Sequence, residues 1–272
     1  MTNNPLGDLT SYPAKYAPDV LYPIPRWPSR SLLEIDKNIQ MYGLDHWQAY
    51  EMSWLNTKGK PQFAIGEFFF NAESENIVES KSLKLYLNSH NNESYESLDM
   101  LTRIVAADLS GVSRSEVKVR ITPLNRCENN LKVDLPGRSI DEEDVVIELT
   151  EPDSSLLYKG AELVFDEELY SHCFKSNCPV TGQPDWATFY VQYTGLQIDK
   201  ASLLRYLCSY RNHQGYHEEC AERIYRDIML RCQPSELFVA MNYLRRGGID
   251  INVYRANRLL GSDCINPRLI RQ

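Results

Sequence analysis

Two runs of alternating apolar and polar residues near the start of the chain predict a β-hairpin. The runs cover residues 45–55 and 62–70 and are rich in Trp, Tyr and Phe. The polar segment Asn56-Thr57-Lys58-Gly59-Lys60-Pro61 joins them, and such glycine- and proline-containing segments are typical of turns. We therefore expect two antiparallel strands that pair through this turn.

Apolar residues recur at helical spacing after the hairpin. They do so from Ser82 to Leu87 and again from Ser94 to Leu109, just before Gly111, which predicts two helices. Residues 117–121 and 145–149 are short apolar runs that we interpret as two further strands. The predicted order of elements in this part of the chain is ββααββ.

The second half of the chain repeats the first at a constant separation of 120 positions. Matching pairs include Phe69 and Phe189, Ser82 and Ser202, Tyr86 and Tyr206, Arg103 and Arg223, and Val119 and Val239. Unrelated helices would need gaps to align so many positions, so we infer a tandem duplication of a ββααββ unit.

The repeat divides the chain into three parts. Residues 1–30 are rich in Pro, Tyr and Asn, and we interpret them as an extended arm that lies over another surface without a core of its own. The first repeat covers 31–135 and the second covers 136–272. Between them a linker near 125–142 contains Asn129-Asn130 and Pro136-Gly137.

Composition argues against several classes of function. The 272 residues include 29 basic and 37 acidic ones, and this net charge of -8 argues against a general binder of nucleic acid or membrane surfaces. Seven cysteines form no Cys-x-x-Cys pair, which indicates neither a disulfide framework nor a zinc ribbon. No apolar segment has the length of a signal peptide or membrane span, so we expect a soluble, cytoplasmic protein.

The stretch from Ser176 to Trp186 holds a cysteine in a turn-rich segment just before a strand-like run. Prolines at two positions and Gly182 fix a short path between Cys178 and Asp185. A thiol needs a nearby base or positive group to become a nucleophile, and an acid working at neutral pH needs a partly dry carboxyl. The pattern fits a nucleophile and an acid, but it also fits a buried structural cysteine beside an aspartate that caps a turn.

The positions at which the repeats differ point to a divided site. Glu79-Ser80-Lys81 in the first repeat corresponds to Asp199-Lys200-Ala201 in the second. Only the second repeat carries the polar segment 211–219 and Arg245-Arg246-Gly247-Gly248. We infer that each half keeps part of one site.

Several short motifs spread over both halves make a specific combination. They are Cys178-Pro179-Val180-Thr181, Gln183-Pro184-Asp185-Trp186, Glu79-Ser80-Lys81-Ser82-Leu83-Lys84-Leu85-Tyr86, Ser209-Tyr210-Arg211-Asn212-His213, Tyr216-His217-Glu218 and Arg245-Arg246-Gly247-Gly248. Together they resemble the NADPH-dependent 7-cyano-7-deazaguanine reductases of queuosine biosynthesis, in their long, duplicated form. The resemblance covers nearly the whole chain, and the Glu-Ser-Lys motif is the family's signature. One departure is Tyr210, where Phe is commoner.

The resemblance implies a fold, a reaction and a set of site residues. The fold is α+β: tandem tunnelling-fold (T-fold) units, each ββααββ, with two helices on one face of an antiparallel sheet. The activity is the reduction of 7-cyano-7-deazaguanine to 7-aminomethyl-7-deazaguanine, with NADPH as cofactor, no metal, and a homodimer as the expected assembly. Cys178 would be the nucleophile and Asp185 the proton donor. Substrate binding would fall to Val78, Glu79, Ser80, His217 and Glu218, and cofactor binding to Ser80, Lys81, Arg246 and Gly247.

The residues alone leave other interpretations of these positions open. Glu218 suits a ligand that presents an N–H and an amino group like a guanine edge, yet it is also placed where a helix dipole favours an acid. Lys81 at a helix start and the Arg246-Gly247 turn can meet phosphate oxygens, or they can be a solvated lysine and a plain hairpin turn. No Gly-x-Gly-x-x-Gly follows a strand, so the cofactor would need a surface groove.

Two other functions compete with the reductase. A cyclohydrolase or pterin-type enzyme on the same fold would need His and Cys ligands converging on zinc, and no such spacing occurs in the sequence. A non-catalytic purine-binding module would keep the pocket, but it would have no use for both Cys178 and Asp185.

Overall fold

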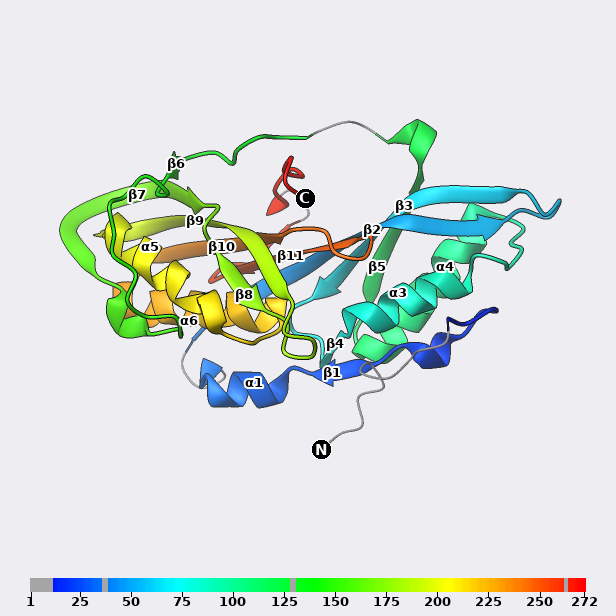
Figure 1. Ribbon diagram of the computed structural model, residues 1–272, viewed down its shortest axis with the longest axis horizontal. Coiled ribbons are helices and arrows are strands. Elements are labelled where there is room, and N and C mark those ends of the chain that lie inside the picture. Colours follow the sequence, from blue (N-terminus) through cyan, green and yellow to red (C-terminus); the bar gives the residue numbers. More distant parts are fainter. Residues whose placement is uncertain (1–11, 36–38, 128–130, 262–263) are drawn as a thin grey trace. The chain divides into compact units, whose positions relative to one another are not determined.

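The computed structural model describes residues 12–35, 39–127, 131–261 and 264–272. Within them the chain forms two compact units (Figure 1). The first unit comprises residues 12–28, 45–127 and 245–251, and the second comprises 29–35, 39–44, 131–244, 252–261 and 264–272. Residues 1–11 of the predicted arm and Asn129-Asn130 of the predicted linker lie outside the described residues.

In the first unit, strands β5, β3 and β2 lie side by side in that order, and β1 and β4 form a separate antiparallel pair. Helix α4 packs against β4 and β5. Most or all of each of the following elements lies in this unit: η2 (Pro18–Val20), β1 (Pro23–Pro25), β2 (Tyr42–Leu55), β3 (Pro61–Asn71), β4 (Asn76–Val78), α3 (Ser80–Ser89), α4 (Leu98–Ser113), β5 (Val117–Pro123) and η3 (Leu124–Arg126). Helix α1 (Trp27–Leu32) begins in this unit and ends in the second.

The second unit has the strand order β11-β10-β9-β7-β6, and the short strand β8 pairs with β9. All these pairs are antiparallel except β6 with β7. Its elements are β6 (Arg138–Ser139), η4 (Ser154–Leu156), β7 (Lys159–Ser171), β8 (Lys175–Asn177), β9 (Pro184–Ile198), α5 (Lys200–Cys208), η5 (Ser209–Asn212), α6 (His217–Cys232), β10 (Glu236–Tyr243) and β11 (Ile249–Ala256).

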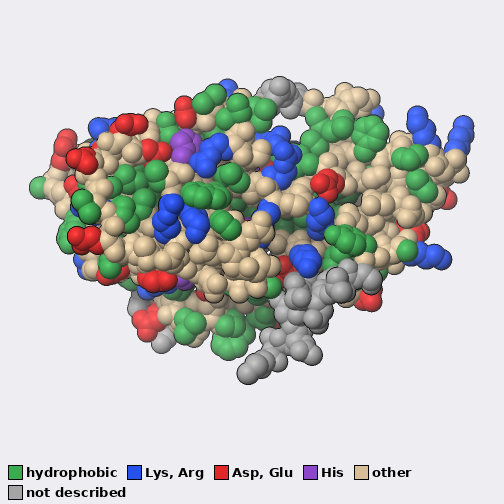
Figure 2. Space-filling model, viewed as in Figure 1, with side chains coloured by type: hydrophobic (Ala, Val, Ile, Leu, Met, Phe, Trp, Pro, Cys, Tyr) green, Lys and Arg blue, Asp and Glu red, His purple; other side chains and the backbone are tan. Residues whose placement is uncertain are grey.

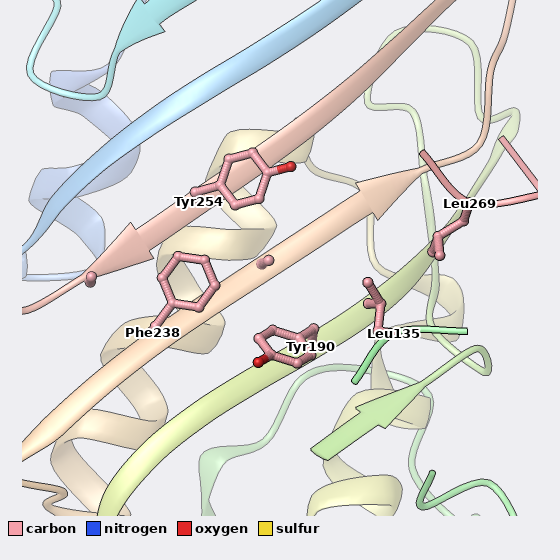
Figure 3. Packing of buried hydrophobic residues seen from close by; sticks show 7 residues of the cluster. Leu135, Tyr190, Phe238, Tyr254 and Leu269 are labelled. Atoms are coloured by element: carbon pink, nitrogen blue, oxygen red, sulfur yellow. The ribbon is translucent and has the colours of Figure 1, made fainter. Parts of the chain in front are cut away.

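Strands β9, β10 and β11 of the second unit are largely buried on both faces. Helix α6 packs against β9 and β10, where Phe189, Val191 and Val239 are fully buried. Figure 3 shows the opposite face, on which side chains of β9, β10 and β11 meet Leu135 and Leu269 from outside the strands. Because both faces lose their contact with water, these strands contain long runs of buried residues without alternation.

The predicted hairpin, both helices and the strand at 117–121 of the first repeat are confirmed, as β2 with β3, α3, α4 and β5. The strand predicted at Val145–Leu149 is wrong, because that run has no regular secondary structure. Val146 in this run is 74% exposed, so its side chain does not pack in a core. The arm does lie over another surface, but Leu21 and Arg26 within it are buried, contrary to the expectation of no core.

The separation of 120 positions holds for the first helix of each unit and not for the second. The buried residues of α4 correspond to those of α6 at a separation of 119. These pairs are Leu101 and Cys220, Val105 and Ile224, Leu109 and Ile228, and Ser113 and Cys232. A deletion in the connecting loop is tolerated, whereas a one-residue shift within a helix would turn its apolar face by about 100°.

Candidate active site

A tight loop in the second unit carries Cys178 and Asp185. Strand β8 ends just before Cys178, and β9 begins one residue before Asp185, with Ser176 opposite Asp185 in the pairing. Within the loop, the Cys178 N–H donates to the Gln183 carbonyl at 2.8 Å, and the Gly182 N–H donates to the Cys178 carbonyl at 2.9 Å. Gly182 has φ +68°, a conformation that favours glycine. The loop therefore holds the thiol and the carboxyl at its two ends.

The first turn of α6 is tied to this loop through the backbone. The Asn177 N–H donates to the His213 carbonyl at 2.8 Å, and the Gly215 N–H donates to the Asn177 carbonyl at 3.1 Å. Residues 213–215 lead directly into α6, whose first two residues are His217 and Glu218. Strand β8 thus fixes the start of α6 relative to Cys178.

His217 lies against the predicted acid. Its Nε2 is 3.5 Å from Asp185 Oδ2, and only 6% of Asp185 is exposed. Glu218 is also buried, at 4% exposure. A carboxyl held away from water beside an imidazole is a geometry suited to proton transfer.

Tyr243, which sequence reasoning missed, completes this part of the site. Its ring lies 3.9 Å from the His217 ring between centroids, and its hydroxyl donates to the His217 carbonyl at 3.4 Å. Burial raises the pKa of Tyr243 well above its usual range, and the charges of Cys220 and Asp185 act in the same direction. The tyrosine therefore stays protonated and holds the imidazole from one side. A buried Tyr at the end of a strand is too common in cores for the sequence to have marked it.

In the first unit, Glu79 caps α3. Its Oε1 accepts from the Lys81 N–H at 3.1 Å, and its Oε2 accepts from the Ser82 N–H at 2.7 Å. Glu79 follows Val78 of the buried strand β4, and the Glu79 N–H donates to the Tyr22 carbonyl at 2.9 Å. The cap thus fixes both the backbone and the carboxylate of Glu79.

Electrostatics set Glu79 apart from an ordinary cap. Burial raises its pKa, although the two backbone N–H groups and the positive charges of Lys81 and Arg246 oppose that shift. Ser80 is partly exposed and Lys81 is exposed on the first turn of α3. The first unit therefore brings Glu79, Ser80, Lys81 and Arg246 near one helix start, where N–H groups and cations favour an anion.

Arg246 and Gly247 belong to a tight turn between β10 and β11. Arg246 and Ile249 exchange backbone hydrogen bonds at 2.9 and 3.2 Å, and Gly247 and Gly248 have φ +61° and +80°. Both values favour glycine, as in the two-residue turns of β-hairpins. The turn is held within the first unit, because Lys84 Nζ donates to the Gly247 carbonyl and the Tyr50 N–H donates to the Gly248 carbonyl at 2.9 Å.

The structure therefore gathers the predicted residues into two clusters. The chemistry cluster in the second unit consists of Cys178, Asp185, His217 and Glu218. The binding cluster in the first unit consists of Val78, Glu79, Ser80, Lys81, Arg246 and Gly247. That both clusters serve one reaction stays a prediction.

Several features of the described residues bear on other chemistries. No group of three or more His, Cys, Asp or Glu among them is arranged to hold a metal ion. No disulfide joins any of the seven cysteines, all of which are described. None of the described helices combines the length and apolar character that crossing a membrane requires. Figure 2 shows Lys and Arg side chains interspersed with acidic and hydrophobic ones over the face in view.

Known proteins match both halves of the chain. Residues 12–121 match the family described as "Nitrile reductase, 7-cyano-7-deazaguanine-reductase N-term", and residues 184–259 match "QueF-like protein". The NADPH-dependent 7-cyano-7-deazaguanine reductase of Dechloromonas aromatica (strain RCB) is 47% identical, over 93% of this chain and 90% of that protein. That of Burkholderia orbicola (strain MC0-3) is 46% identical, over 94% of each. The solved structure of the archaeosine synthase QueF-Like in the apo form covers 36% of this chain and 95% of that chain, at 21% identity and a TM-score of 0.32.

Proposed function

Because this chain belongs to the family of NADPH-dependent 7-cyano-7-deazaguanine reductases, we propose that it reduces the nitrile of 7-cyano-7-deazaguanine to an aminomethyl group. The product is 7-aminomethyl-7-deazaguanine, an intermediate of tRNA queuosine biosynthesis. A nitrile differs from the amine by four electrons, so each turnover consumes two NADPH. Besides family membership, one structural observation supports the proposal. A single loop holds Cys178 and Asp185 at its two ends, and His217 lies against Asp185.

Cys178 begins the reaction by adding to the nitrile carbon. The sulfur–carbon bond forms as one π bond of the nitrile breaks, and the nitrogen gains the proton that the thiol has lost. The product of this addition is a thioimide, whose C=N carbon is a better hydride acceptor than the nitrile. Cys178 is partly exposed at the end of its loop, which is the exposure that an attacking thiol requires.

Asp185 delivers the proton to the nitrile nitrogen. The proton that the thiol loses reaches the nitrogen through this carboxyl, which is nearly dry and lies beside the His217 ring, so solvent has little access to it. Tyr243 keeps the imidazole in position by ring contact and by its hydrogen bond to the His217 carbonyl. After the first hydride has reached the carbon, the carbon–sulfur bond breaks as a C=N bond forms, and Cys178 leaves as a thiolate; the second hydride and a proton then reduce this imine to the amine.

Recognition of the nucleobase uses buried carboxylates. Glu79 and Glu218 are both buried, and a carboxylate can accept hydrogen bonds from the ring N–H and the amino group of a guanine-like edge. Val78 and Ser80 flank Glu79 in the first unit, and His217 precedes Glu218 in the second, so each pair or single neighbour shapes the contacts of the adjacent carboxylate. Each buried charge is costly to desolvate, and a ligand with paired donors offsets part of that cost.

Ser80, Lys81, Arg246 and Gly247 would hold NADPH. NADPH, when bound, supplies the hydrides for both reduction steps. The residues suit its phosphates, because Lys81 is an exposed cation at a helix start, and Arg246 adds a second cation beside a glycine turn. The turn is fixed by Lys84 and Tyr50, which keeps its backbone in one conformation.

The remaining features of the proposal concern fold and assembly. We assign the repeats, at residues 31–135 and 136–272, to two T-fold units, the second of which has the order ββααββ once the short strands β6 and β8 are set aside. We expect a homodimer in the cytoplasm that binds no nucleic acid directly. Sedimentation at the mass of one 31.4 kDa chain would overturn the dimer.

Purified protein mixed with 7-cyano-7-deazaguanine and NADPH tests the function. The expected result is a loss of NADPH absorbance, with two NADPH consumed for each aminomethyl product found by mass spectrometry. NADPH consumption without the amine, or binding of the nitrile without any turnover, would contradict the proposal. The second outcome would instead favour a purine-binding module.

A further inference from the structure

The segment Tyr16–Arg26, here named the N-terminal strap, runs along α3 within the first unit. The Ala17 N–H donates to Ser89 Oγ at 3.2 Å, at the end of α3. The Tyr22 N–H donates to Ser82 Oγ at 3.0 Å, in its first turn. The strap is therefore bonded to both ends of the helix that Glu79 caps.

The strap also has a side-chain anchor on α4. The Tyr16 hydroxyl donates to Asp108 Oδ2 at 2.7 Å, and the same oxygen accepts from the Tyr86 hydroxyl of α3 at 2.6 Å. This shared acceptor joins the strap to α3 and α4 at one point. The strap is thus part of the packing around α3 rather than a loose extension.

Ser82 is the point where the strap, the helix and the cap meet. Its hydroxyl donates to the Glu79 carbonyl at 2.7 Å and accepts from the Tyr22 N–H. The Glu79 N–H donates in turn to the Tyr22 carbonyl at 2.9 Å. These bonds fix the Glu79 backbone on both sides, and the hydroxyl of Ser82 takes part in two of the three.

The second unit contains the same bridge. The Tyr158 N–H donates to Ser202 Oγ at 3.1 Å, the Ser202 hydroxyl donates to the Asp199 carbonyl at 2.7 Å, and the Asp199 N–H donates to the Tyr158 carbonyl at 3.0 Å. Asp199 is exposed, however, and accepts from the Ser202 N–H through one oxygen only. The bridge is therefore a shared structural device, and only the residue that it holds differs between the units.

We propose that Ser82 is a positioning residue for the nucleobase, acting through Glu79; this inference rests on the proposed function. A carboxylate has about four acceptor sites, and the N–H groups of Lys81 and Ser82 occupy two of them. The remaining sites are available to ligand N–H groups only in the orientation that the cap imposes. The Ser82 hydroxyl maintains that orientation by holding the Glu79 backbone against the strap.

Ser82→Ala and Ser202→Ala are matched variants, because each removes one bridging hydroxyl. Both should lower the melting temperature by similar amounts. Only Ser82→Ala should raise the Kd for 7-cyano-7-deazaguanine, by about three- to tenfold, the usual effect of one lost hydrogen bond. Its kcat at saturating nitrile should stay near that of the unaltered protein, and Ser82→Thr, which keeps the hydroxyl, should recover most of the affinity.

Calorimetric titration of all three variants with the nitrile decides the inference. An unchanged Kd for Ser82→Ala, or an equal rise for Ser202→Ala, would overturn it. If the unaltered protein does not bind the nitrile at all, the proposed function fails, and amide hydrogen exchange then tests the bridge separately. The Glu79 amide should exchange faster in Ser82→Ala than in the unaltered protein, and equal exchange would show that the hydroxyl positions nothing.

Discussion

The helix caps Glu79 and Asp199 occupy equivalent positions in the two units and share a set of cap bonds, yet they differ in side-chain length and burial. Both precede a helix, and both have their carbonyl held by a serine hydroxyl at 2.7 Å. Asp199 is exposed and has the short side chain preferred at caps. Glu79 is 7% exposed, has the longer side chain and lies near Lys81 and Arg246. We propose that the two copies share this scaffold and that the cap of the first is specialised for binding.

The loops that precede β3 and β9 also differ between the units, and here it is the second unit that carries the thiol. In the second unit the loop before β9 carries Cys178 and leads to Asp185. In the first unit the loop before β3 is Asn56–Lys60, where the Asn56 side chain accepts from the Lys58 and Lys60 N–H groups and no thiol is present. Under the proposed roles, the nucleophile and the acid lie in the second unit, the residues for the cofactor phosphates lie in the first, and nucleobase-binding residues lie in both.

Replacing Cys178, the proposed nucleophile, should have the largest effect on turnover. Cys178→Ala should reduce turnover below detection in an NADPH absorbance assay, because it removes the thiol that the proposed mechanism uses to form the thioimide. Binding of the nitrile should persist. The control Cys208→Ala removes a thiol of the same unit whose pKa is raised by burial, and it should keep activity. Turnover by Cys178→Ala would contradict the proposal that the second unit provides the nucleophile.

Asp185→Asn separates chemistry from structure. An amide is nearly isosteric with a carboxyl but cannot donate the proton in the same way, so adduct formation should slow by about 10²–10⁴-fold. Nitrile affinity and melting temperature should change little. A near-normal rate of thioimide formation together with a lowered melting temperature would leave Asp185 as a turn cap, whose loss costs about 0.5–2 kcal/mol.

Glu79→Ala and Asp199→Ala test the specialised cap directly. Each variant loses a cap, so each should lose about 0.5–2 kcal/mol of stability. Glu79→Ala should also weaken nitrile binding by about ten- to a hundredfold, as expected for lost hydrogen bonds to a charged group. Calorimetry that finds equal nitrile affinities for the two variants would remove the proposed difference between the units.

The pH dependence of stability should give the smallest effect. Because burial raises the pKa of Glu79 above its ordinary value of 4.5, its ionised form costs stability. The melting temperature of Glu79→Gln relative to the unaltered protein should therefore rise as the pH rises through the range above 4.5.

Glu67 provides the contrast within the same unit. Its burial alone would raise its pKa, but hydrogen bonds and charge from His46 and Arg120 lower it to about 2. Its contribution to stability is therefore present above pH 4.5 and is lost as the pH falls toward 2. Glu67→Gln should be less stable than the unaltered protein at neutral pH, with the difference shrinking in acid. A difference that grows in acid would contradict the assigned shift.

Sequence reasoning succeeded where a pattern has a local physical cause. The paired strands and the helices follow from periodicity, and the family resemblance carried by Glu79, Cys178 and the Arg246 turn is confirmed by identities of 46–47% over nearly the whole chain. The strand expected at Val145–Leu149 failed because an apolar run forms a strand only beside a partner. The chain from the buried residues of α5 to those of α6 is one residue shorter than that from α3 to α4, and this difference escaped notice because a few matches persist in the wrong register.

Contacts between distant segments could not be predicted in the same way. Tyr243 reaches His217 across the packing of β10 against α6, and Tyr22 meets Ser82 from a segment 60 positions away. Neither residue has a motif of its own, and both act through bonds to the backbone. Such contacts depend on the folded arrangement and leave no periodic trace in the chain.

Intact-mass spectrometry of the protein mixed with 7-cyano-7-deazaguanine in the absence of NADPH tests the central claim most directly. Covalent addition of the nitrile releases no leaving group, so the protein should gain the mass of the whole nitrile. Peptide mapping should place this added mass on Cys178. Supplying NADPH should then remove the added mass and release the amine. An adduct on Cys178→Ala, or turnover by a protein that never forms an adduct, would contradict covalent catalysis by the loop of the second unit.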